Sequence, residues 1–445
     1  MARPLATGML HWAFPAMLLV GAVDVATSGR DLTQSFSDLQ ALAEPVRLPA
    51  VAWLQRAVSV LLLVAALEQI VNHIALTRRT PSWPLMAAFL VFWAGTSGSP
   101  AVFGAHPSIS HELLYALAMG TACCLAWPDE RDRILRAARD TLMVLMLAGL
   151  AAMAWRPTLV MDPGYSEGLL QGLPRFAGLT PHPVTQGALA QIAPLLLWAC
   201  PYTRRWMNRA AWVLALGVLV IAQSKAAWIA CVVCLGAMAA VRHGGGFWRR
   251  VGDPRHGAFA LLALGSLALS VLVLAAALVM GDAGGRIADF LQSPQGARLT
   301  TMTGRDRIWA IAEEEWQAHP AFGYGLPLWD AWYRAQINMP HATHAHNQFM
   351  DNAARAGSVG AAALVLYVAV LLAMSLRHAR ATAGLSLGLF LSLALRAISE
   401  VPLSLLGYGT ELFIHLLLLV TLAAAAAGQP ARARRAGALR HGVVP

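Results

Sequence analysis

Long apolar stretches are the feature that most constrains the fold of this chain. They recur from residue 9 to residue 427. Each covers about 20 residues with few charges, enough to cross a bilayer as a helix. Hydrophobic residues make up 58% of the chain and charged residues only 13%, with a mean hydropathy of +0.56. This composition predicts a polytopic membrane protein rather than a soluble one.

The apolar stretches predict an all-α fold with about twelve transmembrane helices. The expected spans are residues 9–26, 50–76, 83–97, 111–127, 134–155, 184–200, 209–223, 226–241, 257–280, 349–376, 384–399 and 409–427. The first span is long enough to remain in the membrane rather than be removed as a signal peptide. The five cysteines all lie in apolar runs, where packing is a more common role than a redox or metal pair.

The spans divide the chain into five expected segments. These are 1–183 with helices one to five and a periplasmic loop, 184–281 with helices six to nine, 282–348 as one long periplasmic loop, 349–427 with helices ten to twelve, and 428–445 as a basic cytoplasmic tail. In the long loop, Ile308, Ala312 and Trp316 recur at helical spacing before Pro320. This pattern predicts a short amphipathic helix along the bilayer surface.

Arginine clusters predict the orientation of the spans. Most of them fall on one side of the predicted membrane, at 78–79, 131–139, 204–209, 242–255, 377–380 and 432–440. The positive-inside rule makes that side cytoplasmic and places both termini inside. The net charge of +10 is then mainly an orientation signal. No nucleic-acid-binding motif accompanies the C-terminal arginines, so no nucleic-acid partner is expected.

Several charged residues lie on the opposite, outer side, where orientation does not explain them. They are Arg175 and His182 after span five, Lys225 after span seven, Arg305 and Arg307 in the long loop, and Arg396 and Glu400 after span eleven. Lys225 is the only lysine in the chain. A lysine snorkelling at a helix end is the plain alternative. Together with Arg175 and Arg305, however, Lys225 would form a cationic group suited to phosphate.

Three histidines close the long loop immediately before an apolar helix, in the run His341-Ala-Thr-His344-Ala-His346-Asn347-Gln348. Titratable groups at a membrane surface are costly unless they have a function, and histidine exchanges protons near neutral pH. This arrangement indicates proton-transfer chemistry. The spacing would also suit zinc or copper. Because no Asp-x-Asp motif appears in the candidate loops, we expect one catalytic histidine and neither a metal nor another cofactor.

Five motifs in order resemble the O-antigen ligase and polymerase superfamily. The main one is His346-Asn347 followed, after nine residues, by Gly357-Ser-Val-Gly360. The others are Arg175-Phe-Ala-Gly178 with His182-Pro183, Ser224-Lys225-Ala-Ala-Trp228, Gly304-Arg305 with Trp309, and His319-Pro320 with Gly323-Tyr-Gly325. The resemblance covers roughly residues 175–420. Lys225 stands where many relatives have arginine, which keeps the charge but not the bidentate geometry.

The resemblance implies a GT-C-like glycosyltransferase in the bacterial inner membrane, with its active site facing the periplasm. Such an enzyme moves a glycan from undecaprenyl pyrophosphate to an acceptor hydroxyl, without a metal. Lipid A core oligosaccharide is the favoured acceptor, because one long loop without a large soluble domain suits an acceptor anchored in the same leaflet. Membrane lipids are the remaining expected partners.

The resemblance also implies roles for individual residues. His346 is the catalytic residue, acting as a general base, while Lys225, Arg305 and Arg175 bind the pyrophosphate. The expected supporting residues are Asn347, Asp351, His344, Arg307 and Glu400. Asn347 or Asp351 would orient the imidazole, although capping of the following helix is an equal alternative for Asp351.

Other functions remain open at this point. A polymerase that joins repeat units and a protein O-oligosaccharyltransferase would share the donor chemistry. A secondary transporter would also have many spans and buried charges such as Asp24, Glu68, Arg396 and Glu400. Against a transporter, the two halves of the chain share no recognisable repeat, and the ionisable residues concentrate on the outer side.

Overall fold

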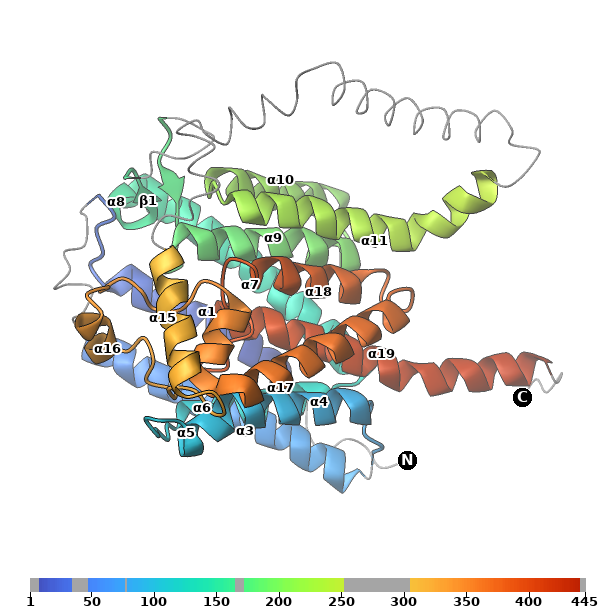
Figure 1. Ribbon diagram of the computed structural model, residues 1–445. Helices are drawn as coiled ribbons and strands as arrows, with labels where there is room; N and C mark the ends of the chain where they lie inside the picture. The colour runs from blue at the N-terminus through green and yellow to red at the C-terminus, as the bar shows by residue number, and fades with distance from the viewer. Residues whose placement is uncertain (1–7, 34–46, 77, 165–171, 252–304, 441–445) are drawn as a thin grey trace, which may run out of the picture. The chain divides into compact units, whose positions relative to one another are not determined.

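The computed structural model describes residues 8–33, 47–76, 78–164, 172–251 and 305–440, without the side chains of 245–251 and 429–440 (Figure 1). By contacts the chain divides into two units. One comprises Met1–Met238 with Ala312–Pro445, and the other comprises Ala239–Ile311. In the second unit, the described residues are the end of one helix and the beginning of another. Everything below concerns the first unit unless stated.

Helices form at nearly all the predicted spans that fall within the described residues. The N-terminal helices are α1 (Leu10–Thr27), α3 (Pro49–Ala75), α4 (Trp83–Trp93), the π-helix η1 (Ala94–Gly98), α5 (Ser99–Phe103), α6 (Glu112–Cys124), α7 (Pro128–Trp155) and α8 (Pro157–Val160). Then follow α9 (Pro183–Ala199), α10 (Arg205–Ile221), α11 (Lys225–Val251), α15 (Arg305–Ala318), α16 (Ala331–Gln336), α17 (Gln348–His378), α18 (Leu385–Arg396) and α19 (Thr410–Arg440). The predicted span 257–280 lies outside the described residues.

Seven helical segments in the described part are long and apolar enough to cross a membrane, judged by length and composition. They are α1, α3, the continuous stretch Trp83–Phe103, α7, Lys225–Gly244 of α11, α17 and Thr410–Gly428 of α19. The shorter helices α6 and α18 are also apolar. An all-α polytopic membrane protein is therefore confirmed in outline. The number twelve and the GT-C-like arrangement stay predictions.

Helix α19 forms the centre of the packing. The apolar part of α19 is 78% buried, whereas that of α3 is 28% buried. Its sequence is apolar around its whole circumference, as expected for a helix surrounded by others. It contacts α6, α7 and α18, while α17 and α18 lie side by side (Figure 1). The helix also continues to Arg440, beyond the expected end of the last span at residue 427.

A glycine interrupts α17 and lets the preceding loop dock against it. Gly357 has φ 62° and ψ −160°, a conformation that favours glycine. At this break the carbonyls of residues 354–355 accept hydrogen bonds from the amides of residues 324–325. The amides of residues 358–359 donate to the carbonyls of residues 320–321. The motifs Gly323-Tyr-Gly325 and Gly357-Ser-Val-Gly360 therefore form one joint between the long loop and α17.

One small strand pair departs from the all-α expectation. Strand β1 (Met161–Asp162) pairs antiparallel with β2 (Arg175–Phe176), and Asp162 lies opposite Arg175. Main-chain pairing of this kind was not apparent in the sequence, because two-residue strands leave no alternating pattern. The pair places Arg175 at a fixed point near the start of α9.

Candidate functional site

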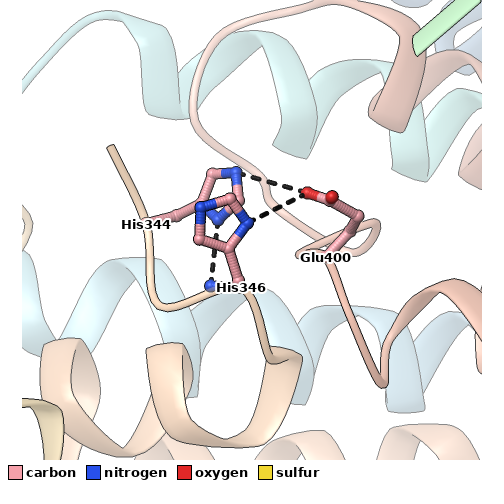
Figure 2. Close-up of side chains that lie close together, drawn as sticks. All are labelled: His344, His346 and Glu400. Atoms are coloured by element: carbon pink, nitrogen blue, oxygen red, sulfur yellow. Dashed lines mark hydrogen bonds and ion pairs between the residues drawn. The ribbon is translucent and has the colours of Figure 1, made fainter. Parts of the chain in front are cut away.

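Two of the predicted histidines face one carboxylate, that of Glu400 (Figure 2). The Nε2 atom of His344 lies 3.4 Å from Oε2 of Glu400, and Nδ1 of His346 lies 3.6 Å from the same oxygen. The histidines precede α17, whereas Glu400 follows α18. The amide of Gln348 donates to the carbonyl of Ala397 at 2.9 Å, which holds these two segments together.

The backbone conformation of His346 lets both imidazoles face Glu400. Its φ of 48° is in the left-handed region, which is uncommon for a residue other than glycine. In this conformation the amide of His346 donates a hydrogen bond to Nδ1 of His344 at 3.0 Å. Because Nδ1 accepts that bond, the proton of a neutral His344 must be on Nε2. The Nε2–H group then points toward the Glu400 carboxylate.

The orientation of His346 leaves one ring nitrogen for chemistry. Its Nδ1 atom is buried without a hydrogen-bond partner, and it faces Glu400 at a separation slightly longer than a hydrogen bond. A proton on Nδ1 would be attracted to the carboxylate, so Nε2 is the nitrogen available to accept a proton. A carboxylate that orients an imidazole and stabilises its protonated form is a common arrangement for a general base.

Charges around Glu400 favour its ionised form. Burial raises the pKa of Glu400, but His346, His344 and Arg396 together lower it more, so the pKa lies below its ordinary value. Burial lowers the pKa of His344, and the neighbouring His346 lowers it further. These shifts favour an ionised carboxylate beside a neutral His344.

The predicted supporting residues Asn347 and Asp351 shape the loop rather than face the imidazoles. The Asn347 side chain caps α17 by accepting hydrogen bonds from the amides of Phe349 and Met350 at 3.0 and 3.1 Å. Asp351 is buried. Its Oδ1 accepts from the amide of Ala345 at 3.0 Å, and its Oδ2 accepts from Nε of Arg355 at 2.9 Å. The two alternative roles of Asp351, orienting the imidazole and capping, stay predictions, and Glu400 is the acid that faces both rings.

Arg355 was missed in the sequence, although its spacing of four residues from Asp351 was a usable signal. Its Nη1 atom also donates to the carbonyl of Leu326 at 2.7 Å. Arg355 therefore links two parts of the site. It binds Asp351, which holds the histidine loop, and also the carbonyl of Leu326 in the segment docked against α17.

The residue before Lys225 lines a cavity that Glu400 also lines. Ser224, Arg396 and Glu400 line one small cavity beside the start of α9, so the residue next to Lys225 reaches the Glu400 segment. Among the described residues, the Lys225 ammonium has no ion-pair or hydrogen-bond partner. Arg175 is buried, and its Nε donates to the carbonyl of Ala222 at 3.4 Å.

His182 connects the cations to the acid. It caps α9, with Nδ1 accepting from the amide of Val184 at 3.2 Å. Burial lowers the pKa of His182, Arg175 lowers it further, and Glu400 raises it. Arg175 and Glu400 are thus both close enough to His182 to act on its charge. The sequence presented His182 as an outer-side residue and as part of a motif, without a role of its own.

Two of the predicted cations cannot be placed against the histidines. Arg305 and Arg307 are in the first turn of α15, within the unit formed by Ala239–Ile311. Their roles stay predictions. Arg396 is placed, by contrast: its guanidinium is buried, with Nη2 3.5 Å from Glu411 and Nη1 buried without a partner.

The donor atoms of His344, His346 and Glu400 all lie within 4.8 Å of one another, close enough to consider a metal ion. A histidine that binds a metal usually donates its other ring N–H to an acceptor. Nδ1 of His344 instead accepts a hydrogen bond from a backbone N–H, so this nitrogen carries a lone pair. The proton of the neutral ring is then on Nε2. A metal bound to this ring would need the lone pair of that same Nε2 atom. This donor set therefore fits a proton acceptor better than a metal centre.

Residues 210–365 match the O-antigen ligase family. The matched region covers only part of the 445-residue chain. It begins in α10, includes Lys225 and His346, and ends in α17. The match supports the superfamily and indicates a glycosyltransferase-like enzyme, but it does not distinguish a ligase from a polymerase. Comparison with curated proteins gives no match.

Proposed function

We propose that this protein transfers O-antigen polysaccharide from undecaprenyl pyrophosphate to lipid A core oligosaccharide, at the periplasmic face of the bacterial inner membrane and without a metal. The observation that carries the proposal is the pair of imidazoles facing Glu400, which shares a small cavity with Ser224, the residue before Lys225. A base beside a cation is what glycosyl transfer from a pyrophosphate donor requires.

The reaction follows from this geometry. The acceptor oxygen attacks the anomeric carbon of the donor glycan, and its proton passes to Nε2 of His346 as the new C–O bond forms. The bond from the anomeric carbon to the pyrophosphate oxygen breaks, and its electron pair leaves with the pyrophosphate. Glu400 stabilises the protonated His346. Lys225 and Arg175 stabilise the charge on the departing pyrophosphate.

Two of the charges that suggested a transporter, Asp24 and Glu68, are only partly buried and already have partners. Asp24 pairs with Arg47 at 3.4 Å, at the end of α1. Glu68 accepts a hydrogen bond from the amide of Met9 and is also approached by Asn72 at 3.4 Å. Charges committed in this way are not available to bind a transported ion, which favours the enzyme over the transporter.

The test is transfer by purified protein in vesicles supplied with the lipid donor. Core lipopolysaccharide, a second donor molecule and a pilin-like protein are offered as acceptors in parallel. Glycan on the core lipid supports the proposal. Glycan joined to the second donor would make the protein a polymerase, and glycan on the pilin-like protein would make it a protein glycosyltransferase.

Two variants separate the base from the cation. His346→Ala should abolish transfer but keep donor binding, because a neutral base contributes mainly in the transition state. Lys225→Ala should weaken both, since the pyrophosphate is charged before and after the reaction, whereas Lys225→Arg should retain more activity. A fully active His346→Ala protein would refute the mechanism. Equal loss of donor binding in His346→Ala and Lys225→Ala would refute the separate role of His346.

A further inference from the structure

A large cavity opens beside His344. It has a volume of about 1110 Å³, and His344 and Glu400 are among its lining residues. Glu400 also lines the small cavity that Ser224 and Arg396 share. The carboxylate that orients the proposed base therefore borders two compartments, and a two-substrate reaction needs room on both sides of its base.

The large cavity changes from polar to apolar along α1 and α3. Asp24 at the end of α1 pairs with Arg47 just before α3, so these two helix ends lie together. Polar residues such as Gln55 line the cavity near this end, whereas Met17 and Leu63 line it farther along the two helices. A cavity with this gradient matches an amphiphile whose polar head reaches the histidines.

The charges of the cavity do not suit a pyrophosphate. Two of its three arginines are already paired, Arg47 with Asp24 at 3.4 Å and Arg355 with Asp351 at 2.9 Å. The third, Arg56, lies over an indole ring at 4.9 Å. Five carboxylates also line the cavity, and like charges raise the cost of binding an anion.

Its remaining polar groups suit uncharged hydroxyls. Among the described residues, the Glu112 carboxylate has no ion-pair or hydrogen-bond partner. The rings of Tyr115 and Tyr408 meet edge to face at 5.5 Å. Carboxylates accept hydrogen bonds from hydroxyls, and tyrosines offer an aromatic face. The Tyr408 hydroxyl donates to the carbonyl of Gln55 at 3.0 Å, so this ring contributes mainly its aromatic face.

We propose that this cavity binds the acceptor, a sugar carried by a lipid anchor, while the pyrophosphate of the donor lies on the Lys225 side of Glu400. The inference rests on the proposed function and adds the place from which the acceptor hydroxyl approaches His346. It assigns Glu112 and the two tyrosines to recognition of the acceptor sugar.

An obstruction variant tests the assignment. Gly21 lines the cavity, and a Cβ at this position would have no atom within 4 Å, so Gly21→Leu should fill open space without disturbing its neighbours. Gly217 of α10 has equally open surroundings but does not line the cavity, which makes Gly217→Leu the matched control. Glu112→Gln is a second variant that changes charge but almost no volume.

The measurements are the KM for core lipopolysaccharide, the KM for the lipid donor, and binding of core lipopolysaccharide without donor. We expect Gly21→Leu to raise the acceptor KM by about tenfold and to weaken core-lipid binding similarly, with the donor KM unchanged. Glu112→Gln should raise the acceptor KM by about threefold, and Gly217→Leu should change neither KM.

The outcomes separate this inference from the proposed function. A raised donor KM with an unchanged acceptor KM in Gly21→Leu would overturn the assignment and give the cavity to the donor. Unchanged values for both substrates in Gly21→Leu and Glu112→Gln would overturn it as well. If wild-type protein transferred no glycan to core lipid in the same assay, the proposed function itself would fail.

Discussion

At the scale of single residues, Glu400 decides which nitrogen of each histidine can act. Its Oε2 faces Nε2 of His344 and Nδ1 of His346, so the two rings present different atoms to one oxygen. The difference arises because the amide of His346 donates to Nδ1 of His344 and turns that ring around. In the proposed reaction His344 is therefore a positioning residue, and His346 is the ring whose nitrogen takes the acceptor proton.

Replacing the carboxylate by an amide should lower turnover. Glu400→Gln removes the charge that stabilises protonated His346, and the amide can also donate a hydrogen bond, which would favour the wrong tautomer. We expect kcat for glycan transfer to fall by about 100-fold, with little change in donor affinity. Glu313→Gln, at an exposed carboxylate of α15, is the control and should keep full activity. Wild-type kcat in Glu400→Gln would remove Glu400 from the mechanism.

The lowered pKa of His344 predicts a loss of stability in acid. Burial and His346 disfavour its charged form in the folded protein. Below about pH 6.5 the unfolded chain therefore binds a proton more readily than the folded one, and stability falls with pH. Glu400 acts in the same direction but at lower pH, because its pKa lies below that of an ordinary glutamate. Asp351 and Arg355 also act on the His344 charge, in opposite directions.

His344→Asn isolates this effect. Asparagine keeps an acceptor for the amide of His346 but does not titrate. Between about pH 7 and about pH 5, the Tm of wild-type protein in detergent should fall further than that of His344→Asn. An equal or larger fall in the variant would show that another group controls acid stability.

The orientation of His344 also predicts the response to chelation. Because its Nδ1 atom faces a backbone N–H, the ring is poorly arranged to bind a metal through Nε2. Transfer activity should therefore survive exhaustive treatment with a chelator, measured before and after metal analysis of the sample. Loss of activity that added zinc restores would convert the histidine and glutamate cluster into a metal centre.

At the scale of elements, the break in α17 joins the long loop to the helix that follows the histidines. Beyond the break, Gly360 lies against the π-helix η1, where its Cβ would be 3.2 Å from the carbonyl oxygen of Gly95. Gly95 in turn leaves room for Ala363. Small residues at these positions let two membrane helices approach closely. These close contacts fix α17, the helix that follows the histidine loop, against η1.

Gly357→Ala should disrupt this joint. A Cβ at Gly357 would lie 2.4 Å from the backbone of Ala321, and the positive φ adds about 1–3 kcal/mol of strain. We expect a lower Tm in detergent together with reduced transfer. Gly217→Ala, where a Cβ meets nothing within 4 Å, should be nearly neutral. Wild-type stability in Gly357→Ala would show that the loop does not dock as described.

At the scale of the whole molecule, orientation in the membrane decides whether the site can meet its substrates. The basic clusters predict that the segment before α7 is cytoplasmic and that the histidine side is periplasmic. The described cysteines are buried, apart from the partly buried Cys200, so an introduced cysteine should give a clear labelling signal.

Single cysteines at two exposed positions test this orientation. Gln336→Cys, at the end of α16, should react with an impermeant maleimide in intact spheroplasts. Asp129→Cys, at the start of α7, should react only after the membrane is permeabilised. The reverse pattern would place the histidines in the cytoplasm, where the proposed donor glycan is absent, and would overturn the proposed function.

The sequence alone determined the helices. A membrane span must satisfy its backbone hydrogen bonds internally, so a continuous apolar stretch of sufficient length is enough to predict it. It also singled out Lys225, the only lysine, and the run of three histidines, from which the family resemblance selected His346. Glu400 appeared as one of five expected supporting residues without a stated role, because neither its spacing nor its neighbours in sequence connect it to the histidines.

Only the tertiary structure decided how these residues meet. The Glu400 carboxylate reaches the imidazoles because α17 and α18 pack side by side and the amide of Gln348 binds the carbonyl of Ala397. Asp351 became a brace for the loop because Ala345 and Arg355 satisfy both of its oxygens. Contacts of this kind depend on how whole helices pack together. A local sequence pattern does not reveal which residues that packing brings together.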